Sequence, residues 1–179
     1  MKVKAFCPGH ISCIFAPCHH PGPLATGSKG LGIVMGLGSE AYVAKRDDDI
    51  VKVTINGIES DAPVTKHAIT SLAPGKGFDV FIRCPLPQGQ GFGTSASGTL
   101  ATAMCVASIM GMDDSLAVKS AHTAENVCGG GLGDVSGLLP GTAVTARIRE
   151  GVPPFGESVP VDIELKRLTV AVLGPPIST

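Results

Sequence analysis

The segment PLPQGQGFGTSAS, residues 85–97, places three glycines at alternate positions directly before small and hydroxyl-bearing residues. The first turn of a helix carries unpaired N–H groups and the positive end of its dipole, so it attracts anions. Bare glycine backbone lets a phosphate approach those groups closely. The pattern therefore predicts a phosphate site at Gly89, Gly91, Gly93, Thr94, Ser95 and Ala96. The alternative is a tight turn followed by an ordinary capping hydroxyl.

Two acids flank a second glycine-rich stretch, HTAENVCGGGLGD, residues 122–134. Glu125 falls near the expected end of a helix, where a negative charge opposes the helix dipole. Asp134 follows three successive glycines and one more, on a turn of the backbone. Phosphoryl transfer from ATP needs a carboxylate on Mg²⁺ and another near the attacking hydroxyl. The alternative for either acid alone is a solvated surface carboxylate.

The elements that must position these groups mix helices and strands without strict alternation, which predicts an α+β fold. Helices are expected from Thr94 to about Met110, and from Asp113 or Asp114 to the glycines after Cys128. β-Branched and apolar runs predict strands at residues 2–6, 32–44, 49–57, 78–84, 142–150 and 166–174. The sequence KRDDD, residues 45–49, is typical of a hairpin connection, and Asn56-Gly57 of a tight turn.

Composition narrows the class of protein. The 179 residues suffice for one compact domain, and 44% hydrophobic against 16% charged residues indicates a globular chain. A net charge of −1 and 4% aromatic residues give no support to nucleic-acid or membrane-surface binding. The N-terminus has no signal-peptide pattern, so we expect a cytoplasmic protein whose six cysteines are reduced and mostly buried.

The glycine segment resembles the second motif of the GHMP kinases, and AFCPGHIS, residues 5–12, is similar to their first motif. The resemblance implies a fold like domain 2 of ribosomal protein S5, with a mixed or antiparallel sheet and helices packed on one face. It implies that the loop, now including Pro87 and Phe92, binds ATP. Ser95 and Glu125 would coordinate Mg²⁺, and Asp134 would deprotonate the acceptor alcohol.

Within that family, GSKGLG (residues 27–32) and AHTAENVCGGGLGDV (residues 121–135) are most similar to the archaeal pantoate kinase branch. This implies an ATP-dependent kinase that converts pantoate to 4-phosphopantoate in coenzyme A biosynthesis. Alternation along TAVTARIRE places Thr145, Arg147 and Arg149 on one strand face. Arg147 is the expected partner of the substrate carboxylate, and the resemblance adds Ser28, His122 and Thr179 around the substrate. His122 has an equally simple alternative, a hydrogen-bonded helix residue.

Length is the main departure from the family, whose members have a second, C-terminal domain. We expect residues 1–179 to form the N-terminal ATP-binding domain only, pairing as a homodimer or with a separate chain that carries the C-terminal domain. Two alternatives stay open. One is another GHMP kinase, homoserine- or mevalonate kinase-like, and the other is a catalytically silent nucleotide-binding half.

Overall fold

Two long strands, β1 (Lys2–Cys18) and β2 (Gly27–Lys45), form an antiparallel hairpin along the whole sheet. The computed structural model describes residues 2–172 and 174–175. The pairing of β1 with β2 shifts register between Pro8 and His10 and again between Ser12 and Ile14. Such irregularities bend a strand and redirect its side chains. They lie where β1 passes the site described below.

The second edge of β2 is shared by two strands. β5 (Phe78–Arg83) pairs with residues 40–45 of β2, and β6 (Val144–Arg149) pairs with residues 30–33. Outside β5 lie β3 (Val51–Ile55) and the short β4 (Ile58–Glu59), and outside β6 lies β7 (Glu157–Pro160). β3 and β5 run parallel whereas the other pairs are antiparallel. The sheet is therefore mixed, as expected for the α+β class.

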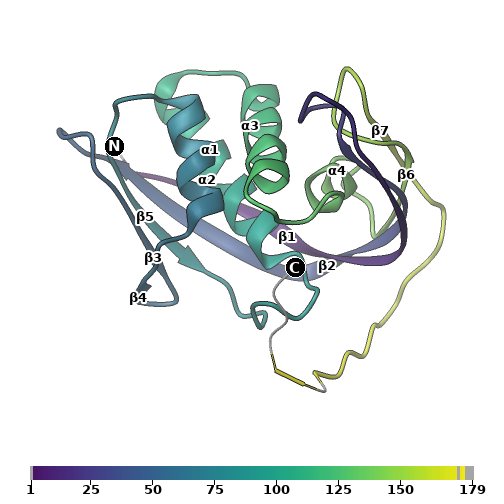
Figure 1. Ribbon diagram of the computed structural model, residues 1–179. Helices are drawn as coiled ribbons and strands as arrows, with labels where there is room; N and C mark the ends of the chain where they lie inside the picture. Colours follow the sequence, from purple (N-terminus) through teal and green to yellow (C-terminus); the bar gives the residue numbers. More distant parts are fainter. Residues whose placement is uncertain (1, 173, 176–179) are drawn as a thin grey trace.

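Three helices lie together on one side of the sheet (Figure 1): α1 (Pro63–Leu72), α2 (Thr94–Met110) and α3 (Asp114–Val127). A short fourth helix, α4 (Asp134–Leu138), packs beside β1 and β6. α2 has no charged residue and consists of small, hydroxyl-bearing and apolar side chains, a composition that suits a buried helix. Its residues Ala101, Cys105 and Val106 are fully buried between the sheet and the other helices.

Both predicted helices are confirmed with their boundaries. Asp113 caps α3 by accepting a hydrogen bond from the Ser115 amide, and Gly111 ends α2 in the left-handed conformation. The Asn56-Gly57 turn is also confirmed, with positive φ at both residues. α1 was not among the expected helices, although Pro63 at its first position is a typical start signal.

Two expectations about strands were wrong. Residues 45–49 do not connect a hairpin, because β5 lies between β2 and β3 and pairs parallel with β3. Arg46 holds this connection to the sheet through Asp48 and Asp79, at 2.6 and 2.7 Å. The strand predicted at residues 166–174 is not formed in its described part. This stretch pairs with no strand of the described chain and its apolar side chains are exposed, so the apolar run alone gave a false signal.

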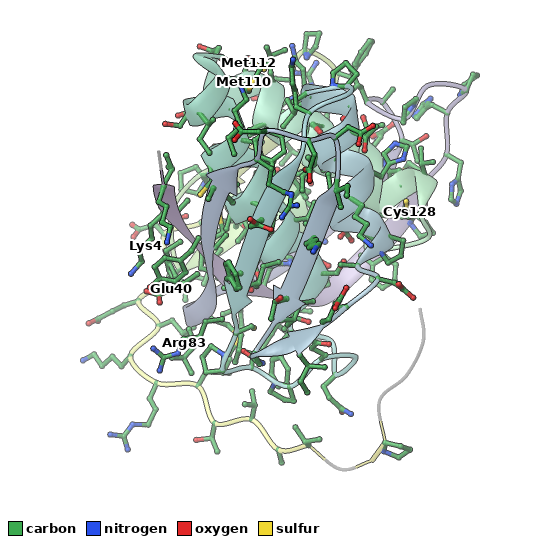
Figure 2. The ribbon with its side chains drawn as sticks, turned by 90° about the vertical axis from the view of Figure 1, so that its left-hand side faces the viewer. Lys4, Glu40, Arg83, Met110, Met112 and Cys128 are labelled. Carbon is green, nitrogen blue, oxygen red and sulfur yellow. The ribbon has the colours of Figure 1, made fainter. Side chains whose placement is uncertain are left out.

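The opposite face of the sheet carries no helix of the described chain (Figure 2). Lys4 and Glu40 form a 2.8 Å ion pair there, and the exposed side chains of Phe6, Tyr42 and Phe81 lie on the same face. No helix in the described residues has the length and hydropathy to cross a membrane.

All six cysteines are free, but only half of them are buried. Cys7, Cys84 and Cys105 lie in the core, and burial raises the pKa of the Cys7 thiol to about 12. Cys13 and Cys128 are exposed and Cys18 is partly so, which corrects the expectation that most are buried.

A matched pair of phenylalanines on β5 tests which face of the sheet holds the core. Phe78 is fully buried under the helices, whereas Phe81 is 54% exposed on the other face. Phe78→Ala should lower the free energy of unfolding by roughly 3–5 kcal/mol through lost burial and a residual cavity. Phe81→Ala should change it by less than about 1 kcal/mol. Equal losses for both variants in urea denaturation would contradict this assignment of the core.

Candidate functional site

The glycine loop, residues 88–93, turns through three positive-φ glycines and leads directly into α2. Gly89, Gly91 and Gly93 have φ values of 67°, 76° and 61°, which glycine adopts without strain. No side chain caps the N-terminus of α2. The amides of its first turn are therefore available to an anion.

The loop and both predicted acids line one cavity of about 550 Å³. Its walls include residues 89–95, residues 128–131, Glu125 and Asp134. A neighbouring cavity of about 600 Å³ shares Gly89, Thr94 and Ser95 with it and extends toward the start of α1. The two hollows meet at the start of α2, so a ligand bound at the loop has room on both sides.

Glu125 is fully buried near the end of α3 and contacts the start of α2. Ser95 Oγ donates to Glu125 Oε1 at 2.6 Å, and the Gly131 amide donates to Oε2 at 2.7 Å. Burial raises the pKa of Glu125, while these two hydrogen bonds act in the opposite direction. A Cβ at Gly130 would collide with Oε2, so the backbone approaches the carboxylate as closely as glycine allows. Glu125 is thus a buried acid without a cationic partner among the described residues.

Asp134 is the first residue of α4, and not part of an extended flexible turn as the run of glycines suggested. Its Oδ1 lies 2.8 Å from His10 Nδ1, and its side chain is 20% exposed. A Cβ at Gly131 would collide with the other carboxylate oxygen, Oδ2, on the cavity side. One oxygen is therefore fixed by a buried partner and the other faces the cavity.

Arg147 is buried on β6 with no carboxylate in contact. Its Nη1 lies 3.3 Å from His10 Nε2, its Nη2 donates to Ser12 Oγ at 3.4 Å, and its Nε has no partner. Burial lowers its pKa, partly offset by the charge of Asp134. Thr145 is buried on the same strand face, but Arg149 is exposed and pairs with Glu157 at 2.9 Å. A register shift between β6 and β7 at this point explains why the predicted alternation fails at Arg149.

Ser28 and His122, two further residues predicted around the substrate, have different surroundings. Ser28 is buried next to Arg147, since a Cβ at Gly133 would meet both Ser28 Oγ and Arg147 Nε. His122 is buried in α3, where its Nε2 lies 2.8 Å from the Thr26 carbonyl and its Nδ1 has no partner. Its contacts are those of a hydrogen-bonded helix residue, and burial lowers its pKa.

The other loop residues differ in exposure. Ala96 faces the core with its side chain, so only its amide can serve a ligand at the loop. Phe92 anchors the loop by packing on Cys84 and Leu86. Pro87 is exposed before the loop and does not line the cavity. Thr179 lies outside the described residues.

His10 is the residue that the sequence reasoning missed. It is 1% exposed and contacts both Asp134 and Arg147, yet only the segment around it was noted, as a first-motif resemblance. Its backbone amide also donates to the Phe92 carbonyl at 3.0 Å. The available signal was a histidine inside a recognised motif, CPGHIS.

Comparisons with known proteins agree with this geometry. Residues 54–142 match the family described as GHMP kinases N terminal domain. The chain is 33% identical over 184 residues to a pantoate kinase of Thermococcus kodakarensis, and 30% identical over 183 residues to one of Methanospirillum hungatei. Both alignments cover 97% of this chain and 61% of the relative. The chain thus spans less than two thirds of their length.

Solved structures show the same fold. One described as a phosphotransferase related to the CoA biosynthesis pathway superposes with a TM-score of 0.86 at 32% identity, covering 92% of this chain and 58% of that one. A homoserine kinase from Cytophaga hutchinsonii gives a TM-score of 0.64 at 20% identity, covering 88% and 51%. Motifs, fold and relatives agree, and the chain belongs to the GHMP kinase family, of which it carries the N-terminal domain.

Proposed function

We propose that this chain takes part in the ATP-dependent phosphorylation of pantoate to 4-phosphopantoate in coenzyme A biosynthesis. The observation that carries the proposal is a buried arginine, Arg147, without a carboxylate partner, joined through His10 to an acid at the glycine-loop cavity. The relatives named pantoate kinase support the same acceptor. Because the chain spans 61% of the first two relatives, the activity of the whole protein is part of this proposal.

The loop supplies the phosphate site, and the neighbouring cavity supplies room for the nucleoside. The amides of residues 93–96 face the triphosphate, and the hydroxyls of Thr94 and Ser95 add donors. The cavity that reaches Ile55, Ile82 and the start of α1 is apolar enough on its sheet side to receive the adenine ring.

Ser95 and Glu125 fit a magnesium site. Mg²⁺ prefers oxygen ligands and is typically held by one or two carboxylates together with substrate phosphates. The pair offers one hydroxyl and one buried carboxylate that has no cation beside it in the described chain. Bound Mg²⁺ would neutralise phosphate charge during transfer.

Asp134 serves as the base in this proposal. As the acceptor oxygen bonds to the γ-phosphorus and ADP leaves, the hydroxyl proton passes to the cavity-facing Oδ2 of Asp134. The other oxygen keeps its contact with His10, so the carboxylate does not have to reorient. Arg147 binds the acceptor carboxylate, for which its planar guanidinium is suited, and Ser28 lies beside it.

Incubation of the purified chain with Mg-ATP and pantoate, homoserine or mevalonate tests the function directly. ADP release with pantoate above the other two acceptors supports the proposal. Turnover with homoserine or mevalonate instead would identify another GHMP kinase activity. Tight Mg-ATP binding without turnover would identify a nucleotide-binding half, which either a second copy or a separate chain completes.

We place this activity in the cytoplasm, since free cysteines suit a reducing compartment.

Asp134→Asn should lower turnover by about 10²- to 10⁴-fold, the usual contribution of a positioned base. The affinity for Mg-ATP in calorimetry should be nearly unchanged, since the glycine loop stays intact. Asp114→Asn, an exposed acid at the start of α3, is the matched control. An Asp134→Asn variant with wild-type turnover would remove Asp134 from the chemistry.

Glu125→Gln should weaken Mg²⁺-dependent ATP binding by roughly 10-fold or more, since Gln keeps one side-chain oxygen but removes the negative charge of the carboxylate. Because burial raises the pKa of Glu125 above its ordinary value of 4.5, wild-type affinity should already fall as the pH drops from 7 toward about 5. Calorimetric titrations across this range check both effects, with the exposed Glu164→Gln as control. Unchanged magnesium dependence in Glu125→Gln contradicts the metal assignment.

Arg147→Lys keeps the positive charge but loses the planar pair of donors, so the KM for pantoate should rise by about 10-fold or more. The Kd for ATP should stay within a factor of about 2 of the wild-type value. Arg149→Lys, two residues along the strand and exposed, should change neither value. If both substitutions raise the KM equally, the buried arginine is not the specific partner of the acceptor.

A further inference from the structure

His10 contacts three parts of the site: the glycine loop, Asp134 and Arg147. Its amide donates to the Phe92 carbonyl at 3.0 Å and so fastens the glycine loop to β1. Its ring contacts Asp134 Oδ1 through Nδ1 at 2.8 Å and Arg147 Nη1 through Nε2 at 3.3 Å. The ring is fully buried, so water does not compete for either contact.

The chemistry of the two partners fixes where the proton of the ring must lie. A guanidinium has N–H donors and no acceptor, so the nitrogen that faces Arg147 must carry a lone pair. A neutral imidazole with an unprotonated Nε2 carries its proton on Nδ1, which then donates to Asp134 Oδ1. Asp134 Oδ1 is therefore the acceptor in this contact.

The ring also packs closely against the backbone of two other elements. A Cβ at Gly32 of β2 would collide with Nε2, and one at Gly137 of α4 would lie 2.5 Å from the same nitrogen. β2 and α4 thus each have a glycine where their backbone approaches the imidazole. Such close packing restricts the movement of the ring.

We propose that His10 is a positioning residue, held as the Nδ1–H tautomer, that orients the acid Asp134 and the arginine Arg147 at the same time. The neutral ring separates the two charges, and no ion pair joins them directly in the described chain. Asp134 consequently keeps Oδ2 free for a substrate proton, and Arg147 keeps Nε free for an anion. The inference deepens the proposed function and rests on it for the reaction, whereas the tautomer itself does not depend on activity.

Long-range ¹H–¹⁵N correlation spectra of the 179-residue chain test the tautomer without any turnover. The His10 ring, assigned by its loss in His10→Asn, should show a protonated Nδ1 and an unprotonated Nε2 near neutral pH. The exposed His20, which pairs with Glu150, serves as the internal reference for a ring in solvent. A His10 ring protonated at Nε2, alone or together with Nδ1, overturns the proposal.

Two substitutions separate the two contacts in kinetic measurements. The Asn amide nitrogen can replace Nδ1 and still donate to Asp134, but Asn does not reach Arg147. The Gln carbonyl can replace Nε2 and accept from Arg147, but it leaves Oδ1 of Asp134 without its donor. His10→Asn should therefore raise the KM for pantoate, and His10→Gln should lower kcat, each by roughly 10- to 100-fold, the typical loss when an orienting partner is removed.

The pattern across these variants decides the role. His20→Asn, the matched control, should change neither parameter, since His20 lies outside the site. Equal effects of His10→Asn and His10→Gln on both parameters would indicate a merely structural residue and overturn the proposal. A wild-type chain without turnover counts against the proposed function, and the tautomer spectrum then decides the inference by itself.

Discussion

The site depends on the antiparallel pairing of α2 and α3. The two helices have 17 and 14 residues and are joined by residues 111–113. At 1.5 Å per residue they span roughly 25 and 21 Å, so the end of α3 returns to the start of α2. The hydrogen bond of 2.6 Å from Ser95 to Glu125 joins the ends at this point. A connection longer or shorter by a turn would bring a different residue of α3 to the glycine loop.

This pairing also resolves an electrostatic conflict in the sequence. Glu125 lies near the end of α3, where the helix dipole disfavours a negative charge. Because α2 runs the other way, the positive end of its dipole lies beside the same carboxylate. The Ser95 hydroxyl and the Gly131 amide each donate to one oxygen of Glu125. Glu125 is thus buried without a cationic partner in the described chain and Arg147 without an acidic one, which suits the magnesium and carboxylate roles proposed for them.

The features predicted correctly from the sequence are those that depend on neighbouring residues in the chain. Glycines at alternate positions before a helix start, an Asp cap before α3 and the Asn56-Gly57 turn each act within a few residues, and the structure has them in place. Strand partners are set by contacts far apart in the chain, so the position of β5 between β2 and β3 could not be read from residues 45–49. The exposed stretch 166–172 shows the converse, because it has the β-branched and apolar residues of a strand but no neighbouring strand in the described chain.

His10 shows why even a well-recognised motif did not reveal the whole site. In the first part of β1, Val3, Ala5 and Cys7 face the core, whereas Lys2, Lys4 and Phe6 are exposed. Continued alternation would place His10 and Ser12 on the exposed face. The pairing with β2 is interrupted between Pro8 and His10, and beyond the interruption both side chains turn toward Arg147. An irregularity of this kind depends on how β1 pairs with β2, and it decides whether the histidine meets solvent or the acid and arginine of the site.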